Sequence, residues 1–431
     1  MPEPITLALG AAVLAPLAAS LGVGLRMLFS GGATSERFVR RMMDVGLSVS
    51  FVGSLATLVI WRGWVSAPVS GEVEYGAWLR IGDYVIPAVA RVDALALALS
   101  VLGAWLTWLV SRFSRTYLHK EPGFARFFIL LGLFAGGVQL VAFAGALDLF
   151  FAGWELIGIA SALFIGFFHE REEPQRSSIR AFATYRLCDA GFLMAMVSVH
   201  EVLGSTRFEV LADAGSLPVW ETTAIAALFL LSAMGKSAML PFSGWLPRAM
   251  EGPTPSSALF YGGISVHMGL FLLLRIWPML NAAPAVELAG VVIGAATAVY
   301  AASVARIHPD AKGALAHATL AQVGLILAEI CLGFTTLAMA HIAGHAMLRV
   351  FQYLRAPNAI HDAHRLGHAR HLPDNTVPTP FAARSYLAAL HRLRLEDRLD
   401  AFVAPVLGLA RVLDAVDRRF RAAFTSERGG Q

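Results

Sequence analysis

The chain has 431 residues, of which 57% are hydrophobic and only 15% are charged. Soluble domains carry about 25% charged residues, so this composition excludes an ordinary soluble domain and favours a chain that lies mostly in lipid. The formal net charge of +4 does not indicate a nucleic-acid partner, and we expect none, because membrane proteins concentrate Lys and Arg in their cytoplasmic loops.

Apolar runs long enough to cross a bilayer, about twenty residues each, recur along the chain. A backbone in lipid must satisfy its own hydrogen bonds, so we expect these runs to be helices of an all-α, polytopic membrane protein. The eleven predicted spans lie near residues 5–29, 43–62, 90–111, 124–144, 146–168, 178–203, 221–241, 254–277, 285–307, 313–332 and 335–355.

The loops between these spans alternate in charge. Loops after the first, third, fifth and ninth spans are rich in basic residues, whereas loops 63–89 and 204–220 are poorer in positive charge. Cytoplasmic loops carry the excess of Lys and Arg, so the pattern predicts an N-terminus outside and a C-terminus inside. We expect a multi-pass protein of a bacterial inner membrane.

The composition changes after residue 356, where the predicted transmembrane domain, 1–356, ends. Residues 357–382 are polar and interrupted by proline, and we interpret them and their histidines as a solvated linker rather than a metal site. Residues 383–425 show helical periodicity with Arg on one side, which is typical of amphipathic helices on a membrane or a partner. We place these helices on the cytoplasmic side.

Several ionisable side chains fall inside the apolar runs. An ionisable group at bilayer depth costs roughly 3 kcal/mol or more, so each is a candidate functional residue. These residues are Glu155, Arg186, Asp189, Lys236, His267, His341, His345 and Arg349. Arg186 and Asp189 are three residues apart, so on a helix they fit either a structural ion pair or a proton-transfer group.

Lys236 gives the clearest indication of a proton relay. The chain has only three lysines, Lys120, Lys236 and Lys312, and uses Arg elsewhere. Arg keeps its proton, whereas a desolvated Lys can release it, and Glu155 could hold Lys236 protonated while the two lie close. Pro241 suggests that the helix is interrupted in the membrane, where freed backbone groups line a polar cavity. A lysine that snorkels from a helix end is the alternative.

The other candidates also allow structural interpretations. His267 fits a core histidine, and Lys312 stands at an inner helix end, where anchors belong. Arg349 cannot deprotonate, which favours a fixed charge. Glu329 lies near the outer end of its span, where it fits a snorkelling side chain or an exit carboxylate.

We expect no metal site and no cofactor in the chain itself. His341 and His345 have a spacing that could bind a metal, but no third ligand is evident. Cys188 and Cys331 lie inside apolar runs, so no disulfide framework is indicated. We therefore expect an ion-translocating pathway without a chemical active site.

At these residues the chain resembles the proton-translocating subunit L of respiratory complex I and its relatives in Mrp antiporters and membrane hydrogenases. The strings that carry the resemblance include GWELIGIASALFIGFF, GKSAMLPFSGWLPRAMEGPTP and AHIAGHAMLRVFQYL, and it covers roughly residues 75–361. The resemblance implies an antiporter-like core of inverted repeats with broken helices. It also implies that Glu155 and Lys236 form a glutamate–lysine pair, with Asp189 as the neighbouring acid.

The same resemblance assigns Lys312, His341 and His345 to a central polar axis. The family usually has His where this chain has Tyr261, with His267 one or two turns further on, and Lys where this chain has Arg349. After residue 361 the family normally continues with another broken span, so the resemblance implies a truncated second repeat.

This shortened form, with ISVHMG in its eighth span, is similar to DabB, the membrane subunit of inorganic-carbon pumps. That similarity implies a large soluble, zinc-containing, carbonic-anhydrase-like partner (DabA-like) on the cytoplasmic side, energised by proton or other cation flux through this chain. The alternative is a proton-pumping subunit of complex I, a membrane hydrogenase or an Mrp-type antiporter. A membrane anchor that conducts nothing is the third interpretation.

Overall fold

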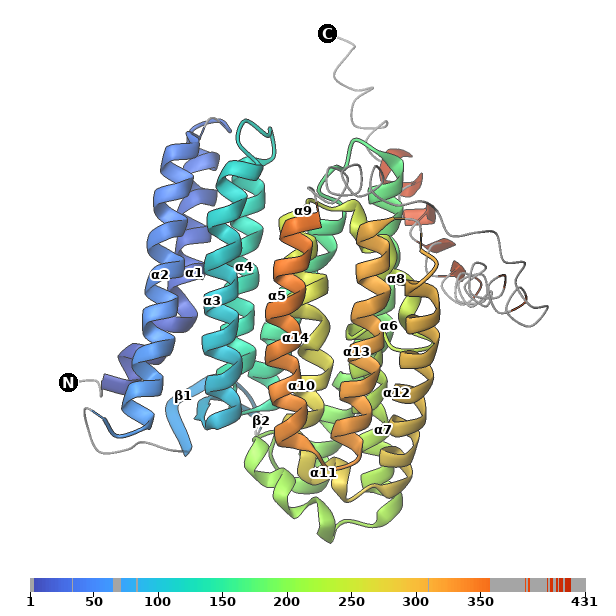
Figure 1. Cartoon of the computed structure of the whole chain (residues 1–431). Coiled ribbons are helices and arrows are strands. Elements are labelled where there is room, and N and C mark those ends of the chain that lie inside the picture. The colour runs from blue at the N-terminus through green and yellow to red at the C-terminus, as the bar shows by residue number, and fades with distance from the viewer. Residues whose placement is uncertain are drawn as a thin grey trace.

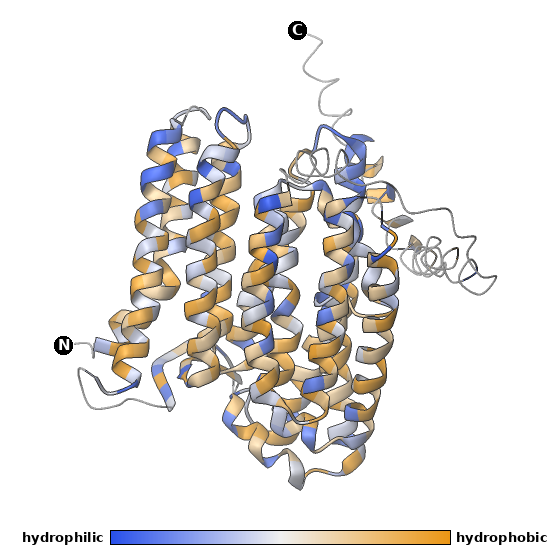
Figure 2. Cartoon of the chain, in the orientation of Figure 1, coloured by the Kyte–Doolittle hydropathy of each residue, from blue (hydrophilic) through white to orange (hydrophobic). Residues whose placement is uncertain are grey.

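The computed structural model describes residues 4–64 and 71–356, except positions 33, 83 and 309. It also describes scattered positions between 384 and 419. Its helices stand side by side in one bundle (Figure 1). Apolar residues cover the length of the bundle, and hydrophilic residues gather toward its ends (Figure 2). The predicted linker, 357–382, and most of the predicted tail helices, 383–425, lie outside the described residues.

Six long helices form the first part of the bundle. They are α1 (Pro4–Phe29), α2 (Glu36–Trp61), α3 (Ala94–Tyr117), α4 (Phe124–Phe143), α5 (Leu147–Ile165) and α6 (Glu172–Leu203). Ser35 and Asp93 cap α2 and α3, because their side chains accept hydrogen bonds from backbone N–H groups of the first turn. Gly53 allows α2 to approach α1, since a Cβ there would lie 2.8 Å from the Ala12 nitrogen.

A β-hairpin occupies much of the stretch predicted as a loop between the second and third spans. Strand β1 (Gly71–Ile81) pairs antiparallel with β2 (Tyr84–Val92). Arg207, just before the 3₁₀ helix η1 (Phe208–Ser216), binds Glu72 at 3.0 Å and Glu74 at 2.6 Å. The hairpin is therefore attached to the loop after α6. We call this end of the bundle the hairpin end. The opposite end holds the basic loops after α1, α3 and α5, and we call it the basic end.

The second part of the bundle contains two interrupted crossings. The first consists of α7 (Val219–Lys236), η2 (Phe242–Gly244), α8 (Trp245–Arg248) and η3 (Ala249–Glu251). The second consists of α9 (Thr254–Ser256), the π-helical η4 (Ser257–Gly263), η5 (Ser265–His267) and α10 (Met268–Arg275). After them come α11 (Trp277–Asn281), α12 (Pro284–Ala305), α13 (Ala311–Cys331) and α14 (Thr335–Arg355).

The structure confirms a mostly helical membrane fold with broken helices, to which the hairpin is the unpredicted addition. Nine helical segments in the described ranges are long and apolar enough to cross a membrane. The predicted spans 221–241 and 335–355 correspond to α7 and α14, which are not among those nine. The count of eleven spans remains a prediction.

Candidate functional site

Lys236 lies where α7 stops inside the bundle. Beyond it the chain continues through turns and the short elements η2, α8 and η3. Trp245 Nε1 donates to the Gly235 carbonyl oxygen at 3.0 Å, which stabilises the carbonyl end of the helix. The negative end of the α7 dipole favours a cation at this position.

The Lys236 ammonium is enclosed by α5 and α6. Lys236 is 1% exposed, and its Nζ donates to the Trp154 carbonyl oxygen at 2.8 Å. The ring centroids of Trp154 and Tyr185 lie 4.6 and 5.1 Å from Nζ, within the range of cation–π attraction. Gly158 leaves room for the ammonium, since a Cβ there would lie 2.9 Å from Nζ.

Arg186 on α6 joins two carboxylates. Its Nη1 lies 2.5 Å from Glu155 Oε2, and its Nη2 lies 2.8 Å from Asp189 Oδ2. Asp189 also accepts a hydrogen bond from Trp154 Nε1 at 2.6 Å. Glu155 is thus paired with Arg186 in this structure, and Lys236 reaches the carboxylates through Trp154. We call these five residues the lysine cluster.

The second broken crossing carries Tyr261 on η4 and His267 on η5. π-helical turns are rare and occur frequently at functional sites. Gly262 lets α14 come close, because a Cβ there would lie 2.6 Å from the Tyr353 ring. Tyr261 donates its hydroxyl proton to the Ser161 carbonyl oxygen of α5 at 2.9 Å.

A directed hydrogen-bond chain runs through two buried histidines, and we call it the histidine chain. Arg349 Nε lies 3.0 Å from His345 Nε2, His345 Nδ1 lies 2.9 Å from His267 Nε2, and His267 Nδ1 lies 2.6 Å from the Gly263 carbonyl oxygen. The arginine only donates, so the first imidazole nitrogen must accept. With both rings neutral, each nitrogen then has the matching role, ending in donation from His267 to Gly263.

His341 lies one turn from the histidine chain on α14, with its ring centroid 6.3 Å from that of His345. Its Nδ1 is 2.9 Å from Glu329 Oε1, and its Nε2 is 3.0 Å from Gln322 Oε1. We call Glu329, His341 and Gln322 the Glu329 triad. The structure thus brings His267, His341 and His345 together from segments far apart in the sequence.

Lys312 stands apart from these groups. It lies in the first turn of α13 at the basic end, with its Nζ 3.5 Å from the Gly252 carbonyl oxygen. In the described part of the chain, no hydrogen bond or ion pair joins it to the other candidate side chains. Its position suits either an anchor or an entry point at the basic end.

Aromatic rings and a hydroxyl lie between the lysine cluster and the histidine chain. Trp245 packs edge-on against Tyr185 and Tyr261, at centroid distances of 5.0 and 6.0 Å. Gly269 of α10 lies so close to α7 that a Cβ would be 2.4 Å from Ser237 Oγ. That buried hydroxyl makes no hydrogen bond within the described residues, so it can bond to a transferred proton or to water.

Several contributors to the site carry no charge and were missed from the sequence. Trp154 links Lys236 to Asp189, Gly158 makes room for the ammonium, and Gln322 bonds His341. The sequence analysis selected candidates by their charge inside an apolar run, and a neutral side chain in such a run gives no signal of that kind. Only the packing of separate helices reveals it.

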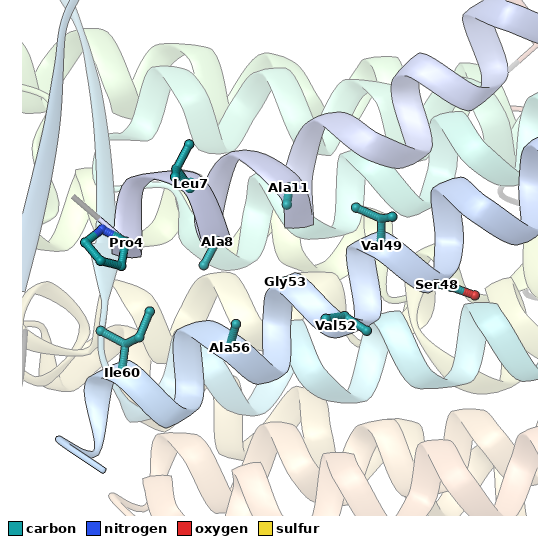
Figure 3. A pocket seen from close by; sticks show the side chains of 10 residues that line it. All are labelled: Pro4, Leu7, Ala8, Ala11, Ser48, Val49, Val52, Gly53, Ala56 and Ile60. Carbon is teal, nitrogen blue, oxygen red and sulfur yellow. The ribbon is translucent and has the colours of Figure 1, made fainter. Parts of the chain in front are cut away.

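A groove between α1 and α2 is a different kind of feature. It has a volume of about 570 Å³ and is lined by apolar and small side chains such as Leu7, Ala11, Val52 and Ala56 (Figure 3). Leu7 and Val52 are exposed, as expected for side chains that face lipid. The groove has no titratable lining residue, so it is not a candidate for ion transfer.

Two family models match the chain. One, described as NADH:quinone oxidoreductase/Mrp antiporter, TM, matches residues 144–377. The other, described as NADH-Ubiquinone oxidoreductase (complex I), chain 5 N-terminus, matches residues 78–128. The residues of the lysine cluster, the histidine chain and the Glu329 triad all lie within the range that the first model matches.

Curated relatives carry names from the same group. NADH-quinone oxidoreductase subunit L of Rhodobacter capsulatus is 31% identical over 373 residues, which are 82% of this chain and 51% of that protein. NAD(P)H-quinone oxidoreductase subunit 5, organellar chromatophore 1, of Paulinella chromatophora is 32% identical over 324 residues, which are 73% of this chain and 48% of that protein. The chain therefore spans about half the length of these relatives.

Among solved structures, the Mrp complex from Dietzia sp. DQ12-45-1b contains a chain of similar fold. The two align with a TM-score of 0.69 and 24% sequence identity, covering 84% of this chain and 37% of that one. This likeness supports the antiporter-like fold.

Proposed function

The chain belongs to the NADH:quinone oxidoreductase/Mrp antiporter family of membrane subunits, and from this premise we propose that it conducts protons, or another small cation, across the membrane. The observation that supports conduction best is Lys236, a fully enclosed lysine beside two carboxylates that share one arginine. Burying an amine at this depth costs free energy, which a purely structural role could avoid with an apolar residue.

The geometry suggests how a proton would pass the lysine cluster. Protonation of Glu155 or Asp189 removes negative charge near Lys236 and loosens the carboxylate's pair with Arg186. The ammonium then loses electrostatic stabilisation and can release a proton toward the histidine chain. Return of the carboxylate to its ionised form favours protonation of the amine again. Ser237 and Tyr261 lie between the lysine cluster and the histidine chain, along the direction of this transfer.

We infer further that this flux energises uptake of inorganic carbon by a large soluble zinc-containing partner of carbonic-anhydrase-like type at the basic end. The support is the similarity of the ISVHMG segment, at residues 264–269, to the membrane subunit of such pumps. One proton crossing 100 mV releases about 2.3 kcal/mol, enough to shift an equilibrium more than tenfold. In this proposal the basic end faces the cytoplasm.

The alternative function is proton pumping within a redox complex or exchange within an Mrp-type antiporter. The names of the curated relatives and of the structural neighbour favour it. In that case protons would be driven outward by electron transfer, or exchanged for another cation. The same lysine cluster would carry the protons.

Growth at low carbon dioxide separates these functions. We expect the chain, expressed with its soluble partner, to restore growth of a host that lacks carbonic anhydrase, and Lys236→Met to abolish that rescue. Lys120→Met is the matched control, because Lys120 is exposed at the basic end and should leave growth intact. Absence of rescue by the unmodified pair would contradict the carbon-uptake proposal, and full rescue by Lys236→Met would point to an anchor that conducts nothing.

A further inference from the structure

The Glu329 triad joins two helices at one edge of the polar region. His341 Nδ1 lies 2.9 and 3.1 Å from the two oxygens of Glu329 on α13. Its other ring nitrogen faces the side-chain amide of Gln322, at 3.0 Å. An amide can present its oxygen or its nitrogen, so Gln322 can accept from an imidazolium or donate to a neutral ring. The triad can therefore satisfy both protonation states of His341.

Exposure increases along this row of histidines. His267 and His345 are 1% and 5% exposed, whereas the side chains of His341 and Glu329 are 24% and 22% exposed. The ring centroids of His345 and His341 lie 6.3 Å apart, and one water molecule can bridge two rings at this distance. The row of histidines thus passes from buried to partly exposed side chains.

The triad also lies toward one end of the bundle. Glu329 is in the last turn of α13, which ends at Cys331, and His341 is less than two turns into α14, which begins at Thr335. At 1.5 Å per residue, His341 is about 9 Å along α14 from its start. Both helices meet at the hairpin end, opposite Lys312 and the arginine-rich loops.

From this position and exposure we propose that the Glu329 triad is the mouth through which protons enter or leave at the hairpin end, exchanging with the histidine chain. The inference rests on the proposed conduction. Glu329 exchanges protons with water, and His341 passes them to or from His345. A carboxylate at the mouth also attracts cations from solution.

Site-directed thiol labelling tests the location. In a chain with Cys188→Ala and Cys331→Ala, single variants Glu329→Cys and His345→Cys would react with a membrane-impermeant methanethiosulfonate reagent. Tyr75→Cys on the hairpin and Glu170→Cys at the basic end are exposed markers of the two sides. We expect E329C to react from the same side as Y75C, at least tenfold faster than H345C. Reaction from the E170C side, or a rate equal to that of H345C, would overturn the proposal.

Flux through reconstituted full-length chain tests the role. We expect Glu329→Gln to reduce potential-driven proton flux about tenfold while thermal stability stays near the unmodified value, and Glu329→Asp to restore part of it. Normal flux in E329Q together with no flux in Lys236→Met would remove the mouth and leave the proposed function standing. Normal flux in both variants would contradict proton transfer through Lys236 as well as through the mouth.

Discussion

Lys236 keeps its ammonium in the bundle with few direct partners. A charged hydrogen bond contributes about 1.5–3 kcal/mol, and a desolvated cation–π contact about 2 kcal/mol. Trp154 supplies both, and Tyr185 adds a second ring. Removing an ammonium from water costs several kcal/mol, which is of the same order. These contacts therefore offset much of that cost, and they make the position of the ammonium depend on Trp154 and Tyr185.

Gly158 offers a test of the ammonium's position that leaves its chemistry unchanged. We expect Gly158→Ala to lower proton flux several-fold, because the new methyl group would lie 2.9 Å from Nζ and push the flexible end of Lys236 off the Trp154 carbonyl. Flux in reconstituted vesicles measures this. Gly344→Ala is the matched control, since nothing lies within 4 Å of a Cβ there. Equal flux in both variants would mean that the observed ammonium position is not used.

Charge in an apolar run was enough to select most of the site from the sequence. Glu155, Asp189, Lys236 and the histidines all carry that signal, and the structure places them in neighbouring groups. Their partners were harder to predict, because a contact such as that of Trp154 with Lys236 depends on how α5 meets the end of α7. The pairing of Glu155 with Arg186 rather than Lys236 is a detail of the same kind.

Interrupted helices position both halves of the site. The break after Lys236 was predictable from Pro241, because proline cannot continue the backbone hydrogen bonds of a helix. The hairpin was not predicted, since its second strand, YVIPAVARV, merges with the apolar start of α3 in the sequence. Only the Gly-Asp pair at 82–83 and the alternation in EVEY indicated strands. That signal is weak beside a long apolar run.

An ion pair attaches the start of α3 to the end of α10. Asp93 Oδ2 accepts from Arg275 Nη1 at 2.6 Å, and its other oxygen caps α3 by accepting from the Ala96 N–H. Burial alone would raise the pKa of the Asp93 carboxyl, but the Arg275 guanidinium beside it holds that pKa below its usual value. A carboxyl of this kind stabilises the fold above its unfolded pKa of about 3.9, and the stabilisation is lost as pH falls through the lower folded value.

We therefore expect Asp93→Asn to lower the free energy of unfolding by about 2 kcal/mol at pH 7, while an asparagine still caps the helix. Thermal unfolding in detergent at pH 7 and pH 3 measures the effect, and the difference from the unmodified chain should shrink at pH 3. Asp213→Asn, at an exposed position of η1, is the control. A D93N variant as stable as the unmodified chain at pH 7 would contradict the role given to this pair.

At the scale of the whole molecule, composition alone indicated a helical membrane protein, and both the bundle and the family matches confirm it. Hydropathy could not settle the number of crossings, because α7, with Lys236, and α14, with His341, His345 and Arg349, are not among the nine apolar segments. Helices α5, α6 and α13 also carry candidate residues, yet they are among the nine apolar segments. Helices α1 and α2, with the apolar groove between them, are among the segments that hydropathy recognises as spans (Figure 3).

Proton flux in vesicles that contain the purified full-length chain tests the central claim most directly. A potassium diffusion potential would drive protons inward, and a pH-sensitive dye would report them. We expect clear flux with the unmodified chain and at least a tenfold loss with Lys236→Arg, because arginine keeps the positive charge but does not release its proton. Flux through the Lys236→Arg variant equal to that of the unmodified chain would contradict proton transfer through this residue.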